Sequence, residues 1–105
     1  MHKVTDMSYM FEFAKSFDQS IGGWNTSNVT YMCSMFSSAI AFNQYLGEWD
    51  VSSVTDISYM FDNAESFNQD ISRWNIGDYT NIFRMFSGCP IKEKNMPKKC
   101  RKNYE

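Results

Sequence analysis

The sequence has few of the residues on which catalysis and metal binding depend. It contains a single histidine, His2, which lies outside the repeated part of the chain. Without a histidine in that part, no nucleophile–base pair can be assembled. The three cysteines, Cys33, Cys89 and Cys100, have no paired short spacing and no histidine among them, which argues against a zinc site. We therefore predict a protein that is not an enzyme and that carries no metal or cofactor.

Phosphate-binding loops and paired catalytic carboxylates are also missing from the pattern. The Gly22-Gly23 pair does not precede a helix in the arrangement that a phosphate-binding loop requires. A two-carboxylate hydrolase needs one carboxylate in an apolar setting. The aspartates fall instead at repeat-equivalent or surface positions, namely Asp6, Asp18, Asp50, Asp56 and Asp70. Such positions are typical of solvated faces and turns.

Long apolar runs are absent as well. No stretch of 18 or more apolar residues is present, so we expect no membrane insertion. The N-terminus lacks the basic and then apolar segments of a signal peptide. We expect a cytoplasmic protein, or a cell-surface one if the chain is a fragment of an exported protein. Aromatic residues make up 17% of the 105 residues, which is enough for a real core.

Positive charge is scarce except at the C-terminal end. Residues 1–90 hold four basic and ten acidic side chains, whereas residues 91–105 hold six basic and two acidic ones. The basic residues of this tail are Lys92, Lys94, Lys98, Lys99, Arg101 and Lys102. We interpret them as a solvated end that keeps the last repeat soluble, and we expect no nucleic-acid partner.

What the sequence does have is a strong internal repeat with a period of 25 residues and no insertion. We predict a repeat region over residues 1–89, with copies at 4–28, 29–53 and 54–78 and a partial copy at 79–89. The positions that recur include Met10-Phe11, Met35-Phe36, Met60-Phe61 and Met85-Phe86, and also Trp24, Trp49 and Trp74. A period of this length indicates units that stack on one another to bury a continuous core.

Each repeat divides into two predicted elements. The apolar spacing from Val4 to Ala14 predicts a short helix near residues 7–14, repeated near 32–39, 57–64 and 82–88. The alternation of Trp24 and Thr26 predicts a short strand. Strands of successive coils would then pair into a parallel sheet. The expected fold class is an α/β repeat with one short parallel strand and one short helix per coil.

The repeat resembles a known family. Met35-Phe36, Phe42-Asn43-Gln44, Trp49-Asp50-Val51-Ser52 and the run from Phe67 to Asn75 look like the repeat of BspA-like leucine-rich-repeat surface proteins. They resemble most closely its 25-residue branch, a mycoplasma lipoprotein-associated domain of unknown function. The resemblance implies a right-handed, leucine-rich-repeat-like solenoid. It also implies surface display and adhesion or host binding, and it brings no catalytic residues.

The two ends of the chain depart from this pattern. The phenylalanine and tryptophan positions fall on Lys92 and Lys99 in the last copy, which Pro90 and Pro97 also interrupt. We predict a C-terminal cap and basic tail over residues 90–105. No matching cap precedes Val4, so the first coil should leave an apolar edge. That edge is the basis of an alternative function, a structural repeat that self-associates through its uncapped N-terminal coil.

Several recurring side chains have both a structural and a functional interpretation. The tryptophans are expected in the core, and Thr5, Thr30, Thr55 and Thr80 are expected as helix caps. The recurring glutamines and asparagines are interpreted as ladders or turn bonds, with an exposed polar row as the alternative. Cys89 occupies a position held elsewhere by alanine, so we expect a small buried side chain. A disulfide between Cys89 and Cys100 is the alternative.

A binding site should use the positions that vary between copies, because stacking fixes the others. On the predicted strand face these positions are Gly23, Glu48 and Arg73, flanked by Ser20, Tyr45 and Asp70. Repeat proteins offer such faces as extended recognition surfaces. The sequence therefore predicts a non-catalytic module that binds a protein partner through these six residues.

Overall fold

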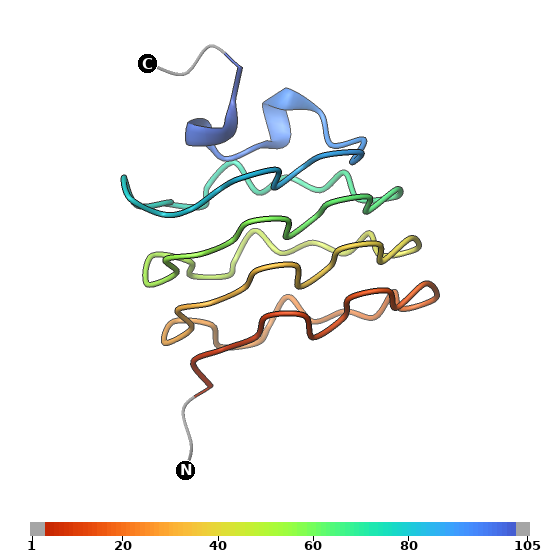
Figure 1. Ribbon diagram of the computed structural model, residues 1–105, viewed down its shortest axis with the longest axis horizontal. Coiled ribbons are helices and arrows are strands. Elements are labelled where there is room, and N and C mark those ends of the chain that lie inside the picture. The colour runs from red at the N-terminus through yellow and green to blue at the C-terminus, as the bar shows by residue number, and fades with distance from the viewer. Residues whose placement is uncertain (1–3, 103–105) are drawn as a thin grey trace.

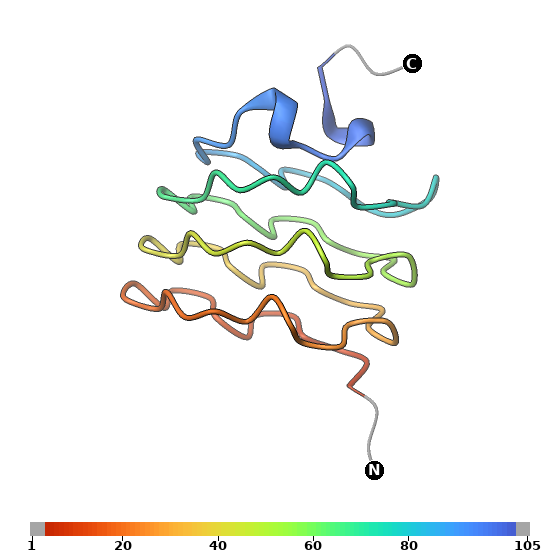
Figure 2. The same ribbon diagram turned by 180° about the vertical axis from the view of Figure 1, so that it is seen from behind.

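The chain winds into coils that stack one above the other. The computed structural model describes residues 4–102, and Figures 1 and 2 show the layers from the two sides. We number them coil 1 (residues 4–28), coil 2 (29–53), coil 3 (54–78) and coil 4 (from 79). Parallel bridges join the same position of successive coils, from Asp6 to Tyr31, Tyr31 to Asp56 and Asp56 to Asn81. The predicted 25-residue register is confirmed by these bridges.

The predicted elements inside each coil are wrong. Within residues 4–102 the chain forms no α-helix and no extended strand, and the bridges are isolated ones. Its regular elements there are two single-turn 3-10 helices near the C-terminus, η1 (Glu93–Asn95) and η2 (Lys98–Cys100). The helices expected at 7–14, 32–39, 57–64 and 82–88 are runs of turns. The fold is therefore a stack of turn-built coils and not an α/β leucine-rich-repeat solenoid.

The backbone hydrogen bonds explain why neither element forms. Alternate N–H groups of the first half of a coil donate to the next coil instead of along their own segment. In coil 1 these bonds join Met7 to Tyr31, Tyr9 to Cys33, Phe11 to Met35 and Phe13 to Ser37, at 2.8 to 3.0 Å. The intervening N–H groups of Met10, Glu12 and Ala14 close turns by donating to carbonyls three residues back. Half of the groups serve turns and half serve stacking, so a helical ladder has no donors left.

Backbone conformation also excludes a helix at these positions. Two residues in each coil, four apart, have a positive φ, which a right-handed helix does not contain. They are Tyr9 and Phe13, Ser34 and Ser38, Tyr59 and Asn63, and Arg84 and Gly88, with φ between 52° and 72°. Two successive turns point Met7, Met10, Phe11 and Ala14 inward. That gives the apolar spacing of three and four residues that is typical of a helix.

The core consists of side-chain ladders that run along the stack. Ring centroids of Phe36 and Phe61 lie 5.5 Å apart, and those of Trp49 and Trp74 lie 6.4 Å apart, with nearly parallel planes. Such aromatic pairs contribute about 0.5–1.5 kcal/mol beyond their buried area. The indole Nε1 groups of Trp49 and Trp74 donate to the carbonyl groups of Ile21 and Leu46, one coil earlier. The predicted core position is confirmed for these two tryptophans.

Polar side chains form ladders of their own. The Nε2 group of Gln44 donates to Asp18, and that of Gln69 donates to Asn43, so the predicted glutamine ladder is confirmed. The threonines are not helix caps, because no helix follows them. Their hydroxyl groups donate to the previous coil instead, from Thr30 to the Thr5 carbonyl at 3.1 Å. These bonds hold the same register as the backbone.

The C-terminal segment folds over the last coil. Its basic side chains bond to backbone carbonyls: Lys99 Nζ donates to Asp78, and Arg101 donates to Met96 and Lys94. The carbonyl of Asn95 accepts from the N–H of Ile71, which ties η1 to coil 3. Part of the basic tail therefore builds structure instead of remaining free.

The positive φ at position 88 predicts a cost for adding a side chain there. In Gly88→Ala, the new Cβ would meet the Asn63 Oδ1 atom in a left-handed backbone conformation. We expect the free energy of unfolding to fall by about 1–2 kcal/mol, as measured by urea denaturation. Gly23→Ala is the matched control, because nothing lies within 4 Å of a Cβ at that position. If both substitutions lowered the free energy of unfolding equally, the strained backbone conformation at Gly88 would be contradicted.

The polar ladder predicts a different result for two substitutions at one site. Asn43 Oδ1 accepts from the Asn68 N–H at 3.0 Å and from Gln69 Nε2 at 3.0 Å. Asn43→Ala removes this acceptor and should lower the free energy of unfolding by about 1 kcal/mol. Asn43→Asp should remain close to wild type, because Asp18 fills the same role one coil earlier. Thermal unfolding of both variants provides the test.

Candidate interaction surfaces

The six residues predicted as a binding site lie on the surface, but they do not form a strand face. All six are exposed: Ser20, Gly23, Tyr45, Glu48, Asp70 and Arg73. The structure brings Glu48 and Arg73 together as an ion pair at 3.6 Å, with both side chains mostly exposed. Exposed pairs of this kind contribute little to stability. The two charges neutralise each other, so the row offers little net charge to a partner.

Local turn bonds use part of the same row. Asp70 Oδ1 accepts from the hydroxyl and the N–H group of Ser72, which lowers the pKa of the Asp70 carboxyl. Asp50 is held by Ser52 in the same way, and its pKa is lowered too. Asn25 accepts from Ser27. The turn-bond interpretation of the recurring Asn25 and Asp50 is therefore confirmed.

The N-terminal end of the stack exposes residues that are buried in every inner coil. Trp24 is 40% exposed, whereas its equivalents Trp49 and Trp74 are 3% and 4% exposed. Met10 is 44% exposed, and Met35 and Met60 are fully buried. We call this end the N-terminal face, formed by Val4, Met7, Met10, Trp24 and the outer side of the Phe11 ring. The sequence predicted this apolar edge, and the exposed fractions confirm it.

The N-terminal face also carries unused backbone acceptors. The face is hollowed by about 360 Å³, lined by Val4, Met7, Met10, Trp24 and Asn25. In coil 2, four carbonyls accept from coil 1. Among the described residues no backbone N–H donates to their counterparts in coil 1, the carbonyls of Asp6, Ser8, Met10 and Glu12. The face therefore combines an apolar hollow with a row of hydrogen-bond acceptors.

Exposed aromatic side chains also line the outside of the turn-built half. They are Tyr9, Phe13, Tyr31, Tyr79 and Phe83. The sequence analysis did not single them out, because it considered only the recurring apolar residues, such as Met10-Phe11, on the inward side of the predicted helices. Their signal was present, since most occupy positions that are polar in other copies.

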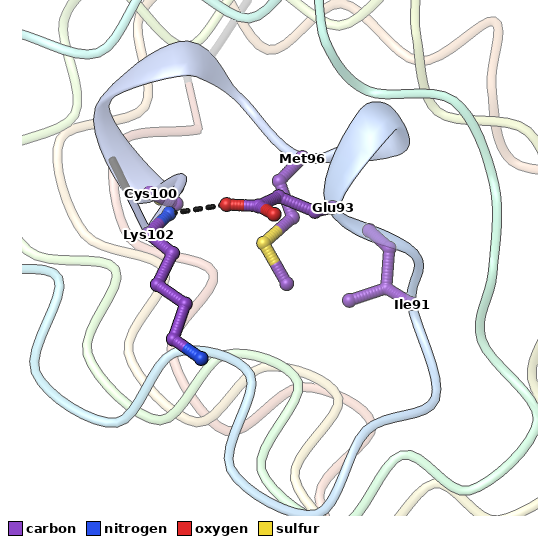
Figure 3. A pocket seen from close by; sticks show the side chains of 5 residues that line it. All are labelled: Ile91, Glu93, Met96, Cys100 and Lys102. Atoms are coloured by element: carbon purple, nitrogen blue, oxygen red, sulfur yellow. Dashed lines mark hydrogen bonds between the residues drawn. The ribbon is translucent and has the colours of Figure 1, made fainter. Parts of the chain in front are cut away.

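A second hollow lies at the C-terminal end. It measures about 410 Å³ and is lined by Ile91, Glu93, Met96, Cys100 and Lys102. Figure 3 shows these side chains between η1 and η2, with Glu93 accepting from the Lys102 N–H group. This bond joins two of the lining residues and ties the end of the segment back to η1, as expected of a cap on the stack.

The cysteines are separate thiols, so the Cys89–Cys100 disulfide is not formed. Burial raises the pKa of Cys89 and that of Cys100 from 9.0 to about 11. Both thiols are therefore protonated at neutral pH, and a protonated thiol is a weak nucleophile. Cys89 packs against the core, as its alanine-equivalent position predicted.

No group of three or more metal-ligating side chains comes together within residues 4–102. In the same part of the chain no helix is long and apolar enough to span a bilayer.

The stack and its exposed end define a class of protein: a tandem-repeat protein built from 25-residue turn coils. The chain matches the family described as Mycoplasma protein of unknown function, DUF285, over residues 1–99, and it belongs to that family. The match agrees with the mycoplasma domain suggested by the sequence. It does not confirm the BspA-like leucine-rich-repeat assignment, whose helices and strands are missing from residues 4–102. Neither the comparison with curated proteins nor that with solved structures found a match.

The buried thiols predict how stability depends on pH. Between pH 9 and 11 the unfolded chain loses thiol protons that the folded chain retains, so the free energy of unfolding should fall as pH rises through this window. Urea denaturation at pH 8, 9 and 10 measures the slope. Cys89→Ala introduces the alanine that the other copies have at this position, as Ala14, Ala39 and Ala64. It should reduce the slope of the free energy of unfolding against pH. An unchanged slope in this variant would contradict the assignment to Cys89.

Proposed function

We propose that this protein is a non-catalytic interaction module that binds a protein partner through its N-terminal face. The supporting observation is the contrast within one chain between Trp24 and its buried equivalents. A tryptophan occupies the same position in coils 1, 2 and 3. Its side chain is buried in coils 2 and 3 and exposed in coil 1. Exposed apolar patches of this kind on soluble proteins mark interaction surfaces.

The row around Glu48 and Arg73 is the less favoured site. Its two charges pair with each other, and Asp70 is already bound by Ser72. Binding there would have to break or bypass these bonds. At the N-terminal face, by contrast, the apolar side chains and backbone carbonyls gain partners and lose none.

Self-association through two N-terminal faces is supported less well than binding of a different partner. Two such faces would bring their carbonyl rows against each other, and the alternate N–H groups that bond these carbonyls inside the chain would be missing. Coil 1 also carries three acidic side chains, Asp6, Glu12 and Asp18, against one basic side chain, Lys15. Like charges would oppose the pairing. If the chain is also related to BspA-like surface proteins, its partner would be a host protein. The support for this relationship is the sequence resemblance alone.

Affinity capture from source-cell lysate, followed by titration with the purified partner, tests the proposal. The double variant Met10→Glu, Trp24→Glu places charge on the N-terminal face and should weaken binding at least tenfold. Tyr79→Glu is the matched control, because Tyr79 is a fully exposed aromatic residue in coil 4.

A second double variant, Glu48→Arg with Arg73→Glu, tests the other surface while keeping the ion pair. Loss of binding in this variant, with normal binding by the N-terminal-face variant, would overturn the proposal. Thermal unfolding of every variant confirms that it is folded.

A further inference from the structure

The N-terminal face of coil 1 is a copy of two faces that are already covered within the chain. The corresponding side of coil 2 is covered by coil 1, and that of coil 3 is covered by coil 2. The residues that recur there are Val4, Val29 and Val54, Met10, Met35 and Met60, and Trp24, Trp49 and Trp74. Because the inner faces are covered by a coil of the same repeat, the chain itself shows what fits this surface.

We propose that the N-terminal face is a docking surface for a further coil of the same 25-residue repeat. This inference rests on the proposed function and names the partner of that face. The added coil donates alternate N–H groups to the carbonyls of Asp6, Ser8, Met10 and Glu12. Inside the chain the equivalent bonds measure 2.7–3.0 Å, as from Phe11 to Met35. The backbone ladder thus continues without a change of register.

Side chains of coil 1 supply matching donors. Trp49 Nε1 donates to the Ile21 carbonyl at 3.1 Å, and Trp74 Nε1 donates to the Leu46 carbonyl at 2.9 Å. Among the described residues, the Trp24 indole has no such acceptor, because that carbonyl would belong to a coil before coil 1. The Thr30 hydroxyl bonds the Thr5 carbonyl, and Thr5 would bond the added coil in the same way. A partner therefore needs carbonyl groups at these places as well as alternate N–H groups.

Aromatic stacking selects a coil over other segments with free N–H groups. Trp24 stacks on Trp49 with ring centroids 6.5 Å apart, and Phe11 stacks on Phe36 at 5.5 Å. On the N-terminal face, the outer sides of Trp24 and Phe11 are free to continue these ladders. An extended peptide could bond the carbonyls, but it would not bring a tryptophan and a phenylalanine to both places at once.

The C-terminal end of a second copy does not offer this surface. There, the tryptophan position is Lys99, which bonds to the Asp78 carbonyl, and the position of Phe17 is Lys92, although Phe86 keeps the position of Phe11. Segment 90–102, with η1 and η2, lies over coil 4 (Figure 1). The partner is therefore a repeat coil whose C-terminal side is not closed by such a cap.

A chain extended by one coil tests this inference. A copy of residues 29–53, with phenylalanine in place of its tryptophan, is inserted directly before Val4, so the junction repeats the natural one between Ser53 and Val54. We expect iodide quenching of Trp24 to fall to the level of Trp49 and Trp74. Amide exchange should show the added coil protected, and unfolding should remain one transition at higher urea. The control carries the same 25 residues in scrambled order.

The inference is overturned if Trp24 remains as accessible to iodide as in the unextended chain, and if the inserted residues are cleaved by protease as fast as the scrambled ones. Partner capture with the same proteins separates this result from failure of the proposed function. An added coil that folds on the face should also abolish capture. If the coil folds but the wild type captures no partner, coil docking stands and the proposed function fails.

Discussion

The backbone hydrogen bonds between coils are the constraint on which the rest of the structure depends. Most of them run forward to the next coil, and at the threonine position the N–H of Thr30 donates back to the Thr5 carbonyl. Coils 1, 2 and 3 each donate from Met7, Tyr9, Phe11 and Phe13, or their equivalents, to carbonyls of the next coil. This pattern holds the period at 25 residues, because one inserted residue would move every donor away from its acceptor. The aromatic, threonine and asparagine ladders all follow the same spacing. They are consequences of the register as much as causes of it.

The same directionality makes the two ends of the stack chemically different. The N-terminal end presents carbonyls and the apolar sides of Met10 and Trp24, and the C-terminal end would present N–H groups. Within residues 4–102 the C-terminal end carries η1 and η2, which the bonds of Lys99 to Asp78 and of Arg101 to Met96 hold in place. Because of this asymmetry, the C-terminal end can close the fold while the N-terminal end provides an interaction surface. The sides of the stack, by contrast, are largely satisfied by their own turn bonds and ion pair.

The candidate surface was predictable from the sequence in part. The repeat was sufficient to predict an apolar edge at coil 1, because Met10 and Trp24 occupy positions whose equivalents in coils 2 and 3 are covered by a neighbouring coil. The ion pair between Glu48 and Arg73 could not be derived, since it depends on the distance between neighbouring coils. The exposed aromatic residues Tyr9 and Phe83 were missed for a related reason. Their outward direction is set by positive φ at positions that a helix would have treated as ordinary.

The sequence by itself determined the period, the stacking of equivalent residues, the buried positions of Phe36, Phe61 and Trp49, and the apolar character of the N-terminal edge of coil 1. Repetition settles these, because equivalent residues that have a coil on both sides share one environment. Only the tertiary structure decided the local conformation. Apolar residues three and four apart face one side both in a helix and in two successive turns, so spacing alone does not distinguish them. The local conformation depends on which carbonyl groups accept from the backbone N–H groups. In the first half of each inner coil, alternate N–H groups donate to the neighbouring coil.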